Sequence, residues 1–373
     1  MAVPPDGAPT NAGSGSALCD YMDELVEALR KLAPAALQQF DKESIHQARV
    51  ATRRLKAAMD LLESVLSDER GKPFARAGRK LRRRLGPMRD LDVMIDHLET
   101  IQRRATHRTA AAWLQERLVE ARETARAQSL DAESPNRVLA KLGNWWGLRE
   151  EVIEVKDQAH SLVAQALHLQ LDAFAEQANQ LGNKQSEVKQ DPHQLRIAGK
   201  ALRYTLEMAK REGHGIPGGV AKAFKRMQDS LGTWHDFVVL TERAMRESLD
   251  GLLAHHDVQL QRQLLDLSRM TLDRARKELD HFSALWAKEG AELLKSIRGA
   301  VPLTHPVAQM KPVVKIEQKA AEVSTPEPVI GQTISTQAVT AEPVIEPKTD
   351  PDPTDSTGQP VPEPSPATDP EAA

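Results

Sequence analysis

A histidine and three basic residues follow one another at helical spacing in one stretch of the sequence. His46, Arg49, Arg53 and Lys56 stand at positions i, i+3, i+7 and i+10, so an α-helix would place all four along one face. A parallel and mostly apolar stripe, rotated by about one position, begins at Ile45. The pattern predicts a helix whose core-facing seam is flanked by a row of cations roughly 15 Å long, at about 1.5 Å per residue.

This pattern occurs a second time, 147 residues further along the chain, where His193 matches His46. The members of the second copy are His193, Arg196, Lys200 and Arg203. A second motif, Leu-Gly-x-x-Arg/His-Asp, is also doubled, ending in Arg89-Asp90 and, 146 residues later, in His235-Asp236. Two motifs in the same order and nearly the same register predict a chain of two homologous helical halves.

A further row of cations lies between the two motifs in each half. Its members are Arg76, Arg79, Lys80 and Arg83 in the first half, and Lys222, Lys225 and Arg226 in the second. Packing these rows against the first ones would build a concave and strongly positive surface. Like charges held this closely repel one another, so such a surface requires interleaved carboxylates or an anionic ligand.

These residue types suit the binding of phosphate groups. Arginine grips phosphate oxygens in pairs, lysine supplies point charge, and histidine adds a donor whose charge rises as phosphate approaches. One charged stripe alone is usually a solvated helix face, and its repetition in both halves favours a polyanion site. His46 and His193 begin their helices, so a structural role at the helix terminus remains open. For Asp90 and Asp236 we expect salt bridges that orient a nearby Arg or His, rather than catalysis.

Composition favours an all-α protein without a membrane span. Ala, Leu, Glu, Arg and Gln dominate the first 300 positions, aromatic residues make up 3%, and no alternating strand pattern is present. With the single cysteine Cys19 and no signal-peptide pattern, we expect a reducing, cytoplasmic location. No P-loop, Rossmann glycine pattern or metalloprotease motif occurs, so we predict no catalytic residues, no metal and no cofactor.

The chain divides into a helical body with two polar ends. Residues 1–17 are expected to be disordered, residues 18–300 to form one domain with halves at about 18–148 and 149–300, and residues 301–373 to be a disordered acidic, proline-rich tail. The tail has 4 Lys+Arg against 11 Asp+Glu, so the body before it has 46 against 42. That body is only mildly basic, and a basic site must come from clustering. Helix breaks are expected at glycine and proline, including Gly71 to Pro73, Gly86-Pro87 and Gly232.

The four ordered motifs resemble the CHAD domain, the conserved histidine α-helical domain, over about residues 18–300. They are His-x-x-Arg-x-x-x-Arg-Arg-x-Lys, Leu-Gly-x-x-Arg-Asp-Leu-Asp-Val, His-x-x-Arg-x-x-x-Lys-x-x-Arg-Tyr-x-x-Glu and Gln-Asp-x-Leu-Gly-x-x-His-Asp. The resemblance implies two pseudo-symmetric helical bundle halves around a basic central cavity that binds inorganic polyphosphate. It also implies an association with polyphosphate or polyhydroxyalkanoate granules.

The family's histidine and basic positions are carried over residue by residue. They fall on His46, Arg49, Arg53, Lys56, Arg89, His193, Arg196, Lys200, Arg203, Tyr204 and His235, and less directly on Arg76, Lys80, Arg83, Lys222, Lys225 and Arg226. The CYTH domain fused to many relatives has no counterpart in this sequence, and Gly199 is expected to loosen the second basic helix by about 1 kcal/mol relative to Ala. The alternative functions are binding of nucleic-acid phosphate backbones and an accessory part in polyphosphate metabolism.

Overall fold

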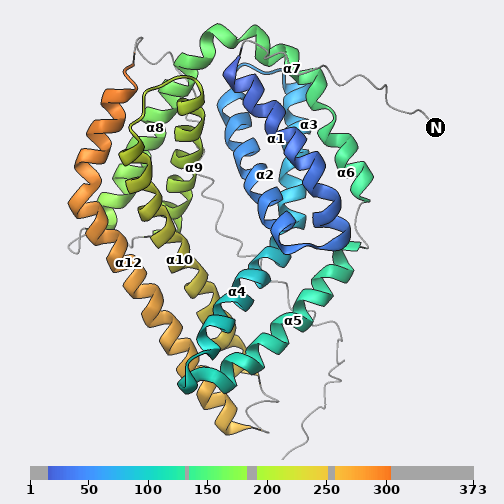
Figure 1. The fold of residues 1–373 in the computed structure, drawn as a ribbon, viewed down its shortest axis with the longest axis vertical. Coiled ribbons are helices and arrows are strands. Elements are labelled where there is room, and N and C mark those ends of the chain that lie inside the picture. Colours follow the sequence, from blue (N-terminus) through green and yellow to red (C-terminus); the bar gives the residue numbers. More distant parts are fainter. Residues whose placement is uncertain (1–15, 131–133, 183–190, 251–256, 304–373) are drawn as a thin grey trace, which may run out of the picture. The chain divides into compact units, whose positions relative to one another are not determined.

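The computed structural model describes residues 16–130, 134–182, 191–250 and 257–303, and within these ranges every regular element is helical. This confirms the all-α prediction. The helices of the first half of the chain (Figure 1) are α1 (Ala17–Pro34), the π-helical turn η1 (Ala35–Gln39), α2 (Lys42–Leu62), α3 (Asp68–Arg84), α4 (Gly86–Gln102), the 3-10 turn η2 (Ala105–His107), α5 (Arg108–Leu130), α6 (Pro135–Leu142) and α7 (Trp145–Glu154). Those of the second half are α8 (Lys156–Gly182), α9 (Pro192–Arg211), α10 (Gly218–Ser248) and α12 (Val258–Ala300). No described helix is long and apolar enough to cross a membrane.

The two basic motifs lie on helices α2 and α9, and each of these helices has an aspartate cap. The carboxylate of Asp41 accepts a hydrogen bond from the backbone of Ser44 at 2.7 Å. Asp191 does the same for the backbone of His193 at 2.8 Å, ahead of a proline at the first helical turn. Each cap satisfies a backbone donor that the first helical turn leaves without a partner. The caps therefore fix where each row of cations starts.

The limits of the helical body differ slightly from the sequence-based ones. Helix α1 begins at Ala17, and the Ser16 side chain accepts from the backbone of Cys19 at 3.3 Å. At the other end Val301 is buried, and its carbonyl accepts a hydrogen bond from Nε2 of His168 at 2.6 Å. The predicted disorder of residues 1–15 and 304–373 lies outside the described residues.

Two of the helix breaks expected at glycine and proline are absent. Helix α3 runs through Gly71 and Pro73, and α10 continues through Gly232. A break does occur at Gly86-Pro87, where α4 begins after Leu85. Proline alone does not explain the difference, because Pro73 lies inside α3 although it lacks the backbone N–H that the helical ladder uses.

Both halves of the chain contribute to both of the hydrophobic cores. The larger core joins the apolar faces of α1, α2, α3, α6 and α7 with those of α8, α9, α10 and α12. The smaller core joins α4 and α5 with α10 and α12. Burial of apolar surface is the main favourable term in folding, so neither half completes its core without the other.

Helices α4 and α10 pass from one core into the other. On α4, Met88 belongs to the larger core and Leu91 to the smaller one. On α10 the same change occurs between Leu231 and Leu240. The Leu-Gly-x-x-Arg/His-Asp motifs lie at these crossings, so their polar ends stand between two apolar clusters.

Gly199 on α9 is required for close packing against α10 and α8. A β-carbon at this position would stand 1.8 Å from Nε2 of Gln228 and 3.0 Å from a ring carbon of Phe174. The glycine therefore permits the approach of neighbouring helices. The sequence-based expectation that Gly199 loosens the helix does not take this close approach of neighbouring helices into account.

Candidate polyanion-binding site

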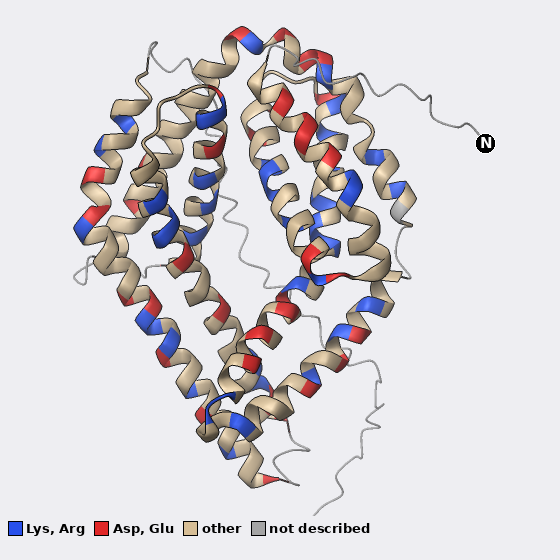
Figure 2. Cartoon of the chain, in the orientation of Figure 1, with Lys and Arg blue, Asp and Glu red and all other residues tan. Residues whose placement is uncertain are grey.

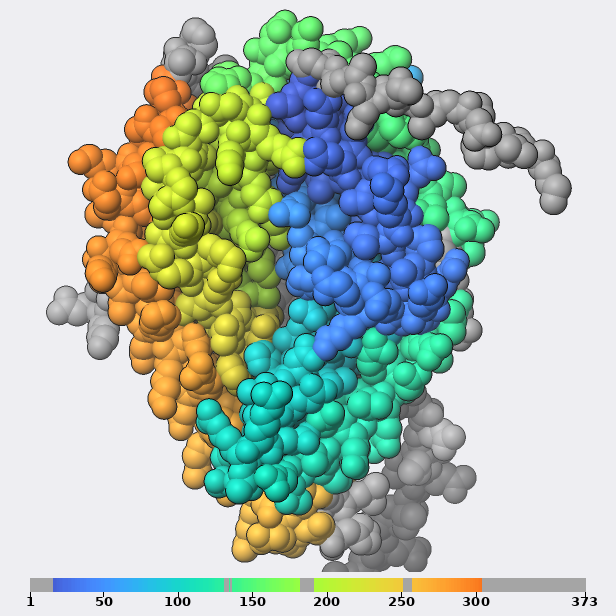
Figure 3. Space-filling view, in the orientation of Figure 1, coloured from blue at the N-terminus to red at the C-terminus, as the bar shows by residue number. Residues whose placement is uncertain are grey.

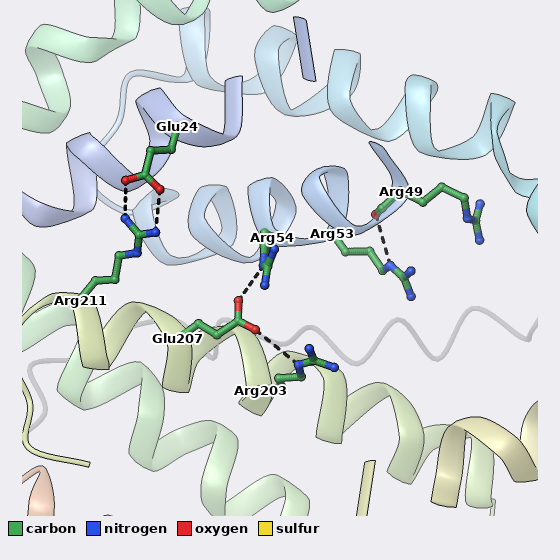
Figure 4. A network of polar contacts seen from close by, with 7 residues as sticks. All are labelled: Glu24, Arg49, Arg53, Arg54, Arg203, Glu207 and Arg211. Atoms are coloured by element: carbon green, nitrogen blue, oxygen red, sulfur yellow. Dashed lines mark hydrogen bonds and ion pairs between the residues drawn. The ribbon is translucent and has the colours of Figure 1, made fainter. Parts of the chain in front are cut away.

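Helices α2 and α9 place their basic residues opposite one another. The Glu207 carboxylate on α9 accepts from Nε of Arg54 on α2 at 2.7 Å and from Nε of Arg203 at 3.4 Å. Figure 4 shows these side chains directed into the space between the two helices, with Arg53 beside them. In the space-filling view of Figure 3 the atoms of the second half abut those of α1 and α2. A carboxylate shared by two guanidinium groups thus joins the two halves.

Four cations of the repeated motifs come close enough to perturb one another. Burial lowers the pKa of Arg196 to about 10, and repulsion from Arg53 and Arg49 acts in the same direction. Burial, followed by Arg196 and Arg53, lowers the pKa of Lys200 well below its ordinary value. Repulsion of this kind falls off with distance, so residues from both halves share one region.

Three motif histidines lie in the same region, and their surroundings lower the pKa of each, which favours the neutral form. Burial and then Arg89 lower the pKa of His46. Burial and then Arg196 lower the pKa of His193, and the same two causes lower that of His235 to about 3. The rings of His193 and His235 are 5.5 Å apart between centroids. We call the group formed by these residues the central cluster; its members are His46, Arg49, Arg53, Arg89, His193, Arg196, Lys200 and His235.

Carboxylates stand at the edge of the central cluster. Asp90 pairs with a terminal nitrogen of Arg49 at 3.5 Å, and Asp236 lies 3.8 Å from Nε2 of His97. The Asp90 side chain is 62% exposed, yet burial raises the pKa of its carboxyl. Two such carboxylates offset only part of the charge of the cluster.

The same guanidinium atom lacks a partner in both copies of the basic motif. Nε of Arg49 and Nε of Arg196 are buried, and neither has a hydrogen-bond partner among the described residues; the same holds for Nδ1 of His46. An unpaired buried donor costs about 1–3 kcal/mol. Unfavourable features that recur at matched positions are typical of functional sites.

The remaining sequence-predicted site residues are exposed, paired with carboxylates or buried. Arg76, Lys80 and Arg83 are exposed along α3, as Lys222 is on α10. Lys225 pairs with Asp229 at 2.5 Å, Arg226 with Glu289 at 2.6 Å, and Lys56 with Asp60. Tyr204 is 7% exposed and belongs to the interior. For these residues a part in ligand binding stays a prediction.

Arg82 joins the cluster although the sequence reasoning passed over it. Its backbone carbonyl accepts from Arg49 at 3.1 Å, and burial, followed by Arg53, lowers the pKa of its side chain. Arg82 follows Gly78 by one helical turn, and Gly78 lets α3 approach Leu55 of α2, to 3.1 Å from an added β-carbon. A glycine one turn before an arginine at the edge of an apolar face is the signal that could have identified it.

The arrangement is suited to holding extended negative charge. The cations stand on helices of both halves, α2, α3 and α4 facing α9 and α10, and Figure 2 shows the basic bands of α2 and α9. Among the described residues no group of three or more His, Cys, Asp or Glu side chains could hold a metal ion. Several cations at one-turn spacing with few carboxylates match a ligand that presents one charge per unit.

Comparison with known proteins identifies the family. The CHAD domain model matches residues 20–245, and the chain belongs to this family. Among solved structures, the chain is similar to the CHAD domain from the plant Ricinus communis, at 23% identity with a TM-score of 0.49, over 79% of this chain and 96% of that one. It is also similar to PptA from Streptomyces chartreusis, at 17% identity with a TM-score of 0.52, over 74% and 99% of the two chains. No curated protein matches.

Proposed function

We propose that this CHAD-domain protein binds inorganic polyphosphate at the central cluster, without catalysis. One observation supports the proposal above all: Arg49 and Arg196, at matched positions of the two halves, each have a buried Nε without a hydrogen-bond partner among the described residues, and other cations nearby repel them. A chain of phosphates would replace this mutual repulsion with attraction. Binding of this kind also releases counterions and therefore weakens steeply with salt.

The decisive experiment compares two double variants with polyphosphate of defined length at two salt concentrations. Arg49→Ala with Arg196→Ala removes the matched cations whose Nε atoms lack partners. Each charged hydrogen bond is worth about 1.5–3 kcal/mol, so we expect affinity to fall on the order of 100-fold or more. The salt slope should decrease by about one to two. An affinity within about twofold of the unmodified protein would refute the assigned site.

A matched control removes the same charges elsewhere. Arg117 and Arg126 lie on α5, are each 46% exposed, and pair with Glu120 at 3.2 Å and Glu123 at 3.3 Å. Replacing both with Ala should leave the affinity nearly unchanged. If the control double variant weakens binding as much as the cluster variant, net charge rather than a site governs binding.

Nucleic-acid binding is the competing function for a basic surface of this kind. Proteins that hold single strands stack bases on aromatic side chains, whereas Tyr204 beside the motif is buried. Competition between polyphosphate and RNA or DNA at equal phosphate concentration should favour polyphosphate. The absence of catalysis is tested by phosphate release with magnesium or manganese, and the association with polyphosphate or polyhydroxyalkanoate granules by cofractionation.

A further inference from the structure

A second basic pocket lies at the far end of α4. It has a volume of about 450 Å³ and is open to solvent, and this volume lies within the range of small-molecule sites. The pocket is lined by Arg104, Thr106, His107, Asp266, Arg269, Met270, Asp273, Arg274 and Lys277. Turn η2 and the first half of α12 thus form its walls.

The wall formed by η2 is held in place by polar contacts at both ends. Nε of Arg108 donates to the carbonyl of Gln102 at 3.3 Å, and the Gln102 side chain bonds that of Gln115 on α5. On the α12 side, Met270 packs against the smaller core. The pocket is therefore a feature of packed elements and not of a loose loop.

Three of the lining cations have no ion-pair partner among the described residues. Arg274 is paired with Glu278 at 2.8 Å, and Asp273 is occupied by Arg276 at 3.3 Å, which leaves Arg104, Arg269 and Lys277. All three are exposed. Against them stands the carboxylate of Asp266. The net positive charge of the pocket is thus available to a ligand.

An acidic stretch of α4 separates this pocket from the central cluster. Arg89 and the end of α4 at Gln102 are 13 residues apart, or about 20 Å along the helix axis. Between them Asp92 is buried and paired with Arg122, Asp96 is paired with Lys42, and Glu99 is exposed. A single polyanion running from one site to the other would pass Glu99 and meet no Lys or Arg of α4 after Arg89, which disfavours one continuous site.

We propose that this pocket is a second anion site, which binds a short phosphate chain such as inorganic triphosphate independently of the central cluster. Arg104, Arg269 and Lys277 approach the ligand from two elements, Thr106 and His107 offer further donors, and Met270 forms an apolar wall. The size of the pocket suits a compact ligand. Asp266 opposes binding and limits the affinity.

The test uses methyl-labelled methionines in the full chain with inorganic triphosphate at about 0.15 M salt, where long-range charge effects are screened. Met270 reports on the pocket, and Met88, which precedes Arg89, reports on the central cluster. Substitution of each by Leu assigns its signal. We expect triphosphate to shift the Met270 signal saturably, both in the unmodified protein and in the variant with Arg49→Ala and Arg196→Ala.

Three variants of α12 complete the experiment. Arg269→Ala with Lys277→Ala should weaken the Met270 response at least tenfold, whereas Asp266→Asn should strengthen it several-fold. Lys288→Ala with Lys295→Ala removes two exposed charges of the same helix outside the pocket and should change nothing. The proposal is wrong if Met270 does not respond, if its response disappears with the central variant, or if the Arg269 and Lys277 substitutions leave it unchanged. Because the central cluster has its own reporter, failure of either site is seen separately.

Discussion

Binding of polyphosphate to the central cluster should take up protons. In the free protein burial, with the neighbouring cations, lowers the pKa values of His46, His193 and His235, the last of them to about 3. Arg196 is the largest charged contributor for both His193 and His235. A bound polyanion would offset this repulsion and raise the pKa values. The complex therefore holds more protons than the free protein.

The sign and size of the pH dependence follow from this difference. Because the pKa is higher in the complex, affinity rises as the pH falls through the pKa of the complex and levels off below the pKa of the free protein. If the ligand restores the ordinary value of about 6.5, each histidine adds at most about fourfold between pH 8 and pH 6. Three histidines together give about 65-fold at most. His235, with its free pKa of about 3, should contribute nearly its full share.

The free protein should also lose stability on acidification. When folding lowers the pKa of a histidine, the unfolded chain binds more protons than the folded protein below about pH 6.5. The stability that this histidine contributes is therefore fully present above that pH, and it is lost as the pH falls toward the pKa of the folded state. For His235 this window extends from about pH 6.5 down to about 3. Because the affinity rises on acidification, the increase in melting temperature caused by polyphosphate should grow as the pH falls from 8 to 6.

Calorimetry in two buffers of different ionisation heat measures the proton count directly. At pH 6.5 we expect net uptake, reduced by the substitution His235→Gln and unaffected by the control His281→Gln, an exposed histidine on α12. Equal heats in both buffers, together with an affinity that does not change from pH 8 to pH 6, would refute the reasoning. Such a result would mean that the ligand does not approach the histidines.

Three further substitutions test the packing and the charge balance. Gly199→Ala should lower the free energy of unfolding by about 1–2 kcal/mol in urea titrations, because overpacking against Gln228 exceeds the gain in helix propensity. Equal or higher stability would contradict the packing argument. Glu207→Gln should cost about 1–2 kcal/mol and lower the melting temperature, since Arg54 loses the carboxylate 2.7 Å away, and an unchanged melting temperature would argue against it. Asp90→Asn should tighten polyphosphate binding by about fivefold, because about 1 kcal/mol of repulsion is relieved in a water-like dielectric. Weaker binding would instead mean that Asp90 positions Arg49.

The all-α fold could be predicted from the sequence, whereas its internal breaks could not all be located. Helical composition and the doubled motifs are local signals, and α2 and α9 begin beside the aspartates that precede each motif. Glycine alone proved ambiguous, because α10 continues through Gly232 while the chain breaks before Pro87. Proline was ambiguous as well, because Pro73 lies inside α3. The tolerance of glycine depends on tertiary packing.

Part of the central cluster could be predicted from the sequence, because helical spacing is a local signal. Spacing placed Arg49 and Arg53 on one helix face, and the repeat predicted that Arg196 and Lys200 would match them. That the two faces approach each other, and that Arg82 joins them, depends on how α2, α3 and α9 pack. Periodicity describes one helix at a time and does not give the distance between helices.

The two cores explain how the protein holds so many cations together before any ligand arrives. Repulsion within the central cluster acts to separate the halves, but α4 and α10 are each anchored in apolar packing on both sides of the cluster. Glu207 adds a link between α2 and α9. Because the cores hold the charges in place, a polyanion bound at the proposed site would not have to order it, and a preorganised site loses less affinity to ordering. Relief of the repulsion between the cations would then contribute to the binding free energy of the proposed ligand.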